Sequence, residues 1–138
     1  MILLDTNVIS EFMRDVPEKD PVIWLDRQPP SSIWTTSISV YEIRSGLLAM
    51  PAGKRQALRI LAFERVLNDL IQGRIAAFDH AAAQRSAELE AAGLKAGRPR
   101  ETRDTMIAGI VLSNHAMLAT RNVKHFDNMA KSVVNPWG

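Results

Sequence analysis

The amino-acid sequence predicts an α/β fold with a mainly parallel central sheet of four to five strands and helices on both faces. Short segments of strand character alternate with helical segments along the whole chain, a pattern typical of parallel sheets with helical crossovers. The chain opens on an apolar run that ends abruptly at Asp5, as expected for a strand in the middle of a sheet. No repeat, low-complexity tract or long linker divides the chain. We therefore expect residues 1–138 to form one domain.

The first half of the chain is expected to contain two strands, at residues 2–4 and 33–36. Helices are expected at residues 7–13, 21–25 and 39–50, and a longer one carries an apolar stripe from Ile60 to Ile71. Asp20 is placed to cap the second helix, with Pro21 at its first position. Ser39 and Glu42 match the capping-box pattern and so predict the start of the third helix.

The second half of the chain begins where Gly73 ends the long helix. Strands are expected at residues 75–78, 116–119 and, as a short edge strand, 133–134. Asp79 is placed to cap an alanine-rich helix that runs to about Lys95. Thr102 is expected to begin a last helix, in which apolar residues recur with helical spacing from Met106 to Val111.

Composition limits the possible class of protein. Hydrophobic residues make up 46% of the 138 residues and charged residues 23%, which are ordinary values for a globular protein. The absence of cysteine excludes disulfides and thiolate metal sites. The N-terminus has no basic segment followed by a long apolar run, so we expect no signal peptide, no membrane span and a cytoplasmic location. The net charge of +2 does not indicate a strong polycation.

Four polar residues from distant parts of the sequence are candidates for a functional site: Asp5, Glu42, Asp104 and Asn122. Asp5 and Asn122 follow expected strands, and ligands of open α/β sheets bind at the carboxyl ends of strands. Glu42 has apolar neighbours on both sides of its helix, and Asp104 shares the helical stripe that should face inward. Each residue also has a plain structural interpretation, as a helix cap, a first-turn acid or a turn residue.

The chemistry of this group favours a hard divalent cation. Three carboxylates brought together repel one another, and at least one would be protonated unless a cation intervened. Oxygen ligands without cysteine or histidine select Mg²⁺ or Mn²⁺ over zinc. Such sites hold one or two ions that activate a water and stabilise the leaving oxygen of a phosphodiester. His80, His115 and His125 show no ligand spacing, and we interpret them as surface or helix-end residues.

Five motifs extend over the whole chain: Met1-Ile-Leu-Leu-Asp-Thr-Asn-Val-Ile-Ser-Glu11, Ser39-Val-Tyr-Glu42, Arg103-Asp-Thr-Met-Ile-Ala108, Ala119-Thr-Arg-Asn-Val-Lys-His-Phe126 and Asn135-Pro-Trp137. With them the chain resembles PIN-domain ribonucleases of the VapC type, and more narrowly their FitB-like branch. The resemblance implies a metal-dependent endoribonuclease, the toxin of a type II toxin–antitoxin system. By motif match, Asp5, Glu42 and Asp104 are its metal-binding and catalytic carboxylates.

The resemblance also implies partners for the chain. They are an RNA substrate, a cognate antitoxin that holds the toxin inactive, and a second copy of the toxin in a homodimer. Operator DNA is expected to be reached only through the antitoxin. The antitoxin of this family lays a helix in an apolar groove, for which Phe12, Trp24 and Phe63 are the candidate residues here. Arg103, Arg121 and Lys124 are candidates for contacts to RNA phosphates.

Asn122 departs from the family pattern, in which a fourth aspartate stands at this place. The substitution removes one negative charge and puts a second tightly bound ion in doubt, although Asp127 could compensate. Thr6 and Thr120 are expected to support the site by hydrogen bonds to a ligand carboxylate or to water.

Three other functions fit parts of the sequence. A housekeeping RNA-processing nuclease without an antitoxin would need the same chemistry. A PIN-like binding module or corepressor with a weakened site would fit Asn122, but the three retained carboxylates argue against it. A phosphohydrolase with Asp5 as nucleophile would need a second acid two residues further on, where this chain has Asn7.

Overall fold

Five short strands form one parallel sheet at the centre of the protein, and the computed structural model describes all residues from Met1 to Gly138. The strands are β1 (Ile2–Leu4), β2 (Ile33–Thr36), β3 (Ile75–Ala76), β4 (Met117–Ala119) and β5 (Val133–Val134), in the spatial order β3-β2-β1-β4-β5. The central strand is β1, in which Ile2 pairs with Ile33 on one side and Met117 on the other. The predicted parallel sheet with its first strand in the middle is confirmed.

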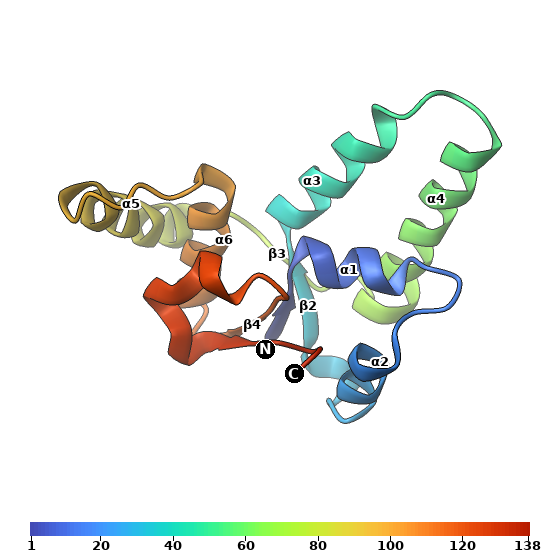
Figure 1. Cartoon of the computed structure of the whole chain (residues 1–138), viewed down its shortest axis with the longest axis horizontal. Helices are drawn as coiled ribbons and strands as arrows, with labels where there is room; N and C mark the ends of the chain where they lie inside the picture. The colour runs from blue at the N-terminus through green and yellow to red at the C-terminus, as the bar shows by residue number, and fades with distance from the viewer.

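Helices cover both faces of this sheet (Figure 1). They are α1 (Thr6–Phe12), α2 (Lys19–Asp26), α3 (Ser37–Leu48), α4 (Lys54–Arg65), α5 (His80–Lys95) and α6 (Thr102–Ser113). The chain also has two 3-10 segments, η1 (Pro30–Ser32) and η3 (Val123–Ser132). A π-helical segment, η2 (Val66–Ile71), continues α4. The longest helix, α5, has 16 residues, and none is long and apolar enough to cross a membrane.

The sheet separates two hydrophobic cores. Leu3 packs into one core with Ile107 and Ile110 of α6, and its neighbour Leu4 packs into the other with Val8 and Ile9 of α1. All six side chains are almost fully buried. Successive strand residues point to opposite faces, so one short strand serves both cores. This explains why β1 is apolar at every position.

Two predicted helix starts are wrong. The capping box of Ser39 and Glu42 does not form, because α3 begins two residues earlier and Thr36 accepts the hydrogen bond of the Ser39 backbone N–H at 3.0 Å. Asp20 is not a cap either, because α2 begins at Lys19 after Glu18 and places Asp20 in its first turn. In both cases a polar residue further upstream takes the N-cap position.

Close packing of α5 against α6 fixes the position of the α6 N-terminus. A Cβ atom at Gly109 would lie 1.9 Å from the hydroxyl oxygen of Ser86, so this position has no room for a side chain. The Ser86 hydroxyl donates a hydrogen bond of 3.0 Å to the backbone carbonyl of Thr105. This contact lies one residue beyond Asp104 and anchors the turn that carries it.

Candidate active site

Asp5 lies at the carboxyl end of β1, between the ends of β2 and β4. Its side chain is only 5% exposed and accepts hydrogen bonds from the Thr6 backbone N–H (2.8 Å) and the Thr120 hydroxyl (2.7 Å). Burial raises the pKa of Asp5, and these two hydrogen bonds offset part of that rise. Asp5 caps α1, as its structural interpretation predicted, and also presents a desolvated carboxylate at the sheet edge.

Asn7 is a member of the site that the sequence interpretation missed. Its side-chain amide donates to Asp5 Oδ2 (3.4 Å) and to the Thr120 hydroxyl oxygen (3.2 Å). Its carbonyl oxygen accepts the backbone N–H of Arg121 (3.0 Å). Asn7 therefore links the ends of β1 and β4, two strands that lie far apart in the sequence and are neighbours in the sheet. The sequence feature that could have identified Asn7 as a site residue is its position two residues after Asp5 in the opening motif.

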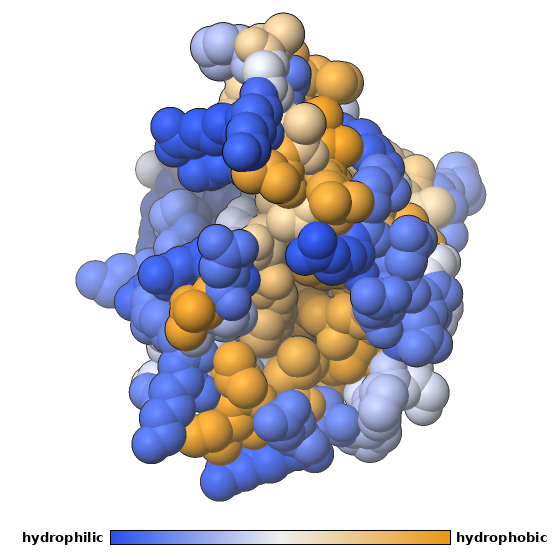
Figure 2. All heavy atoms as spheres, turned by 90° about the vertical axis from the view of Figure 1, so that its right-hand side faces the viewer, coloured by the Kyte–Doolittle hydropathy of each residue, from blue (hydrophilic) through white to orange (hydrophobic).

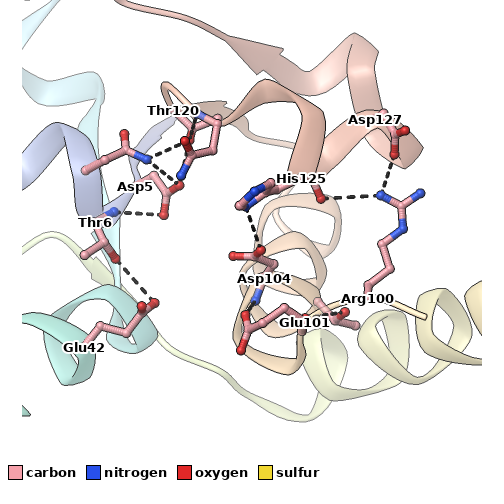
Figure 3. A network of polar contacts seen from close by, with 12 residues as sticks. Asp5, Thr6, Glu42, Arg100, Glu101, Asp104, Thr120, His125 and Asp127 are labelled. Carbon is pink, nitrogen blue, oxygen red and sulfur yellow. Dashed lines mark hydrogen bonds and ion pairs between the residues drawn. The ribbon is translucent and has the colours of Figure 1, made fainter. Parts of the chain in front are cut away.

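Glu42 is half-buried on α3 and points toward the same region as Asp5 (Figure 3). The Thr6 hydroxyl donates a hydrogen bond of 3.4 Å to Glu42 Oε1. It also lies 3.1 Å from the hydroxyl oxygen of buried Ser39. Burial raises the pKa of Glu42, and the negative charge of Asp5 raises it further, while Arg103 lowers it. The expected support from Thr6 and Thr120 is thus present as direct contacts to two carboxylates.

Asp104 faces these two acids from the first turn of α6, and its side chain is 24% exposed. Its backbone N–H donates to the Glu101 carboxylate, which caps the helix. Burial raises the pKa of Asp104, followed in effect by the charges of Glu101 and Asp5, whereas His125 lowers it. His125 Nδ1 lies 3.2 Å from Asp104 Oδ2, so the interpretation of His125 as a surface residue without a role in the site is incomplete.

Asp5, Glu42 and Asp104 border one common space, although their charges are not in direct contact (Figure 3). No three acidic or histidine side chains approach closely enough to share one ion in this arrangement. The donor set nevertheless fits Mg²⁺ or Mn²⁺, because it consists of oxygen atoms and its carboxylates destabilise one another. Mg²⁺ keeps several of its waters and needs only one or two direct carboxylates. A small cleft of about 210 Å³ opens beside Asp104 and His125.

The structure does not support compensation for Asn122 by Asp127. Asp127 pairs with Arg98 at 3.0 Å and with Arg100, and the hydrogen bond from Arg100 is the largest effect that lowers its pKa. These contacts draw it away from Asp5 (Figure 3). Asn122 is exposed and donates its backbone N–H to the Thr120 hydroxyl oxygen at 3.1 Å. Neither Asn122 nor Asp127 therefore adds a carboxylate to Asp5, Glu42 and Asp104.

The three candidates for contacts to RNA phosphates, Arg103, Arg121 and Lys124, have different neighbours. The Arg103 guanidinium lies over the ring of Tyr41, at 5.2 Å from its centroid. Arg121 lies over Trp137 at 4.7 Å and is 3.8 Å from Glu18, so its charge is partly engaged. Lys124 is exposed. The charge of Arg103 also lowers the pKa of Glu42.

A separate groove of about 650 Å³ lies between the end of α1 and α4. Ser10, Met13, Arg14, Asp15, Lys54, Arg55, Leu58, Arg59, Ala62 and Arg65 line it. Figure 2 shows this side of the molecule, where hydrophobic atoms gather in a hollow between hydrophilic rims. The prediction of Phe63 as an exposed groove residue is wrong, because Phe63 is fully buried in the core. Phe12 and Trp24 are half-buried and pack against that core.

Comparisons with known proteins identify relatives of this chain. The sequence model of the PIN domain matches residues 2–132. The chain is 39% identical over 137 residues to plasmid stability protein StbB of Pseudomonas syringae pv. tomato, with 99% of each chain covered. It is 35% identical to VapC ribonuclease Y4jK of Sinorhizobium fredii, over 99% of this chain and 98% of the relative. The solved structure of FitAB bound to an IR36 DNA fragment contains a similar chain, with a TM-score of 0.87, 33% identity and coverage of 100% and 96%.

Proposed function

Because this chain belongs to the PIN-domain family, in its branch of VapC ribonucleases, we propose that it is an endoribonuclease and the toxin of a toxin–antitoxin system. The observation that carries the proposal is the convergence of Asp5, Glu42 and Asp104 on one space at the carboxyl edge of the sheet. These acids come from β1, α3 and α6, so only the folded chain assembles them. Acids that raise one another's pKa are typical of a site that binds a cation.

The substrate bond is a phosphodiester of RNA, which water cleaves. A bound Mg²⁺ or Mn²⁺ would neutralise the three carboxylates, activate a water and stabilise the leaving oxygen. Asp5 would be the central ligand, since Thr120, Asn7 and the Thr6 backbone hold its carboxylate by hydrogen bonds. Glu42 and Asp104 would complete the set. Because Asn122 adds no charge, the proposal includes one tightly held ion, with a second bound weakly or not at all.

The proposed partner is an antitoxin that docks in the groove between α1 and α4. Support comes from the groove itself, whose lining combines three apolar residues, Met13, Leu58 and Ala62, with five Arg and Lys residues. Further support comes from the similar chain in the structure of FitAB, which was solved bound to an IR36 DNA fragment. In our proposal this chain reaches operator DNA only through its antitoxin, and two copies of the chain form a homodimer.

Cleavage of RNA by the purified protein tests the enzymatic part of the proposal. Single-stranded RNA should be cut in Mg²⁺ or Mn²⁺, and not in EDTA or by Asp104→Asn protein. Induced expression should arrest growth of host cells, and co-expression of the adjacent small gene for a DNA-binding protein should restore it. Growth arrest without such a gene would favour a housekeeping nuclease. A folded, metal-loaded protein that cuts no RNA would favour a corepressor.

A further inference from the structure

Tyr41 and Arg103 form an exposed stacked pair at the rim of the acidic site. The ring of Tyr41 on α3 is 55% exposed, and the Arg103 guanidinium from α6 lies 5.2 Å from its centroid. Each residue adjoins a carboxylate of the site in sequence, Tyr41 next to Glu42 and Arg103 next to Asp104. The charge of Arg103 also lowers the pKa of Glu42. The pair therefore bridges two helices directly beside the acids.

The ring of Tyr41 does not serve the packing of the protein. It belongs to neither hydrophobic core, nor does it pack against either of them as a half-buried neighbour. The other two stacked pairs differ, because Arg44 lies over the fully buried Phe63. Trp137, under Arg121, is tied to Glu18 by a hydrogen bond of 2.9 Å from its indole N–H. Only in the Tyr41 pair is a large part of the aromatic ring open to solvent.

We propose that Tyr41 and Arg103 bind an unpaired nucleotide of the RNA next to the scissile phosphate. The base stacks on the ring of Tyr41, and the Arg103 guanidinium contacts a phosphate. Aromatic rings beside basic side chains recur in proteins that bind single strands, since every unstacked base offers a π-face. A base inside a duplex has both faces covered by its stacked neighbours, so Tyr41 makes the enzyme prefer single-stranded RNA. The inference rests on the proposed RNA cleavage.

Binding of a short single-stranded RNA tests the pair without requiring catalysis. The background is Asp104→Asn protein in Mn²⁺, and the readout is fluorescence anisotropy of a labelled oligoribonucleotide. Tyr41→Leu should weaken binding by about tenfold, whereas Tyr41→Phe should retain it, because stacking needs the ring and not the hydroxyl. Leu48→Ser is the matched control, since Leu48 is 70% exposed on the same helix. Its affinity for RNA should be unchanged.

Cleavage kinetics with Asp104 intact separate this inference from the proposed function. Tyr41→Leu should raise KM for single-stranded RNA and leave kcat close to wild type. If wild type cleaves RNA and Tyr41→Leu matches it in KM and affinity, the pair does not bind the substrate. A Tyr41→Leu variant that loses antitoxin affinity but keeps RNA affinity would assign the ring to the protein partner and overturn the proposal. Wild type that cuts no RNA contradicts the proposed function itself.

Discussion

His125 Nδ1 lies 3.2 Å from Oδ2 of Asp104, and this contact joins η3 to the first turn of α6 beside the acidic site. His125 is 57% exposed, so its ring can be replaced without opening the core. Both its charge and its hydrogen bond lower the pKa of Asp104, against the effects of burial and of the Glu101 and Asp5 charges. Asp104 therefore depends on His125 for part of its ionisation.

His125→Ala should raise the pKa of Asp104 and weaken binding of Mn²⁺. Partners that hold a metal ligand in place are typically worth about 10- to 100-fold in metal affinity, and we expect a loss of about tenfold. The loss should be larger at the lower of two pH values, because protonated Asp104 cannot bind a cation. Calorimetric titration with Mn²⁺ measures it. His80→Ala is the control, as His80 is exposed at the start of α5. Equal affinities for the two variants at both pH values would remove His125 from the site.

Asp104→Asn should abolish cleavage and stabilise the metal-free fold. The shape of the side chain is kept, but a charge that the acidic surroundings disfavour is removed. We expect cleavage to fall by about 100-fold or more, while Tm in EDTA rises. Asp69→Asn makes the same charge change on an exposed residue outside the site, and should leave the cleavage rate unchanged. Cleavage at the wild-type rate by folded Asp104→Asn protein would contradict the proposed role.

The stability of the metal-free protein should fall as pH rises above about 4. The folded-state pKa values of Asp5, Glu42 and Asp104 lie above their ordinary values of 3.8, 4.5 and 3.8, so the folded protein binds more protons than the unfolded chain. The free energy of unfolding therefore decreases with pH through the interval between the ordinary and the raised values. An Asp5→Asn, Glu42→Gln, Asp104→Asn triple variant should lack this decrease.

Divalent cations should offset this loss of stability. A ligand at 100 times its Kd stabilises the folded state by about 2.7 kcal/mol, because only the folded chain has the assembled site. Melting curves from pH 4 to pH 8, in EDTA and in Mn²⁺, measure both effects for wild type and the triple variant. Parallel curves for the two proteins in EDTA, with equal shifts in Mn²⁺, would show that the three acids do not act together.

The sequence was sufficient to predict the sheet and the acids that border the site. Alternation of apolar strands with helices is a local pattern, and it determines a parallel sheet whose carboxyl ends gather Asp5 and Thr120. Asp104 was recognisable because a favourable helix dipole explains an exposed first-turn acid better than an acid on an inward-facing stripe. In each case the signal lies within a few residues of the side chain concerned.

Contacts between distant segments were not predictable in the same way. Thr36, Ser37 and Ser39 are all able to cap a helix, and the register of β2 decides that Thr36 does so. The pairing of His125 with Asp104 depends on the course of η3, which has non-helical backbone angles at Phe126 and Met129. The burial of Phe63 likewise depends on how α4 packs against α3 and the rest of its core, which the amphipathic pattern of one helix does not specify.

The groove between α1 and α4 carries a strong positive charge, since five of the ten residues that line it are Arg or Lys and only Asp15 is acidic. Its apolar lining includes Leu58, which is 56% exposed. An amphipathic helix with acidic residues beside its apolar face would match both features. Leu58 is also a better test residue than Trp24, because Trp24 packs against the core and its removal would reduce stability.

Leu58→Asp and the double variant Arg55→Glu, Arg59→Glu should therefore weaken antitoxin binding and leave RNA cleavage by the free toxin intact. Loss of an apolar anchor in such an interface typically costs about 2 kcal/mol, or roughly 30-fold in Kd. The charge reversal should act mainly on the association rate and should remove most of its dependence on salt. Arg85→Glu on α5, where Arg85 pairs with Glu88, reverses a charge away from the groove and is the control. Surface plasmon resonance at two salt concentrations gives both rates. If the double variant binds the antitoxin as fast as wild type but loses RNA cleavage, the basic groove belongs to the RNA and the antitoxin docks elsewhere.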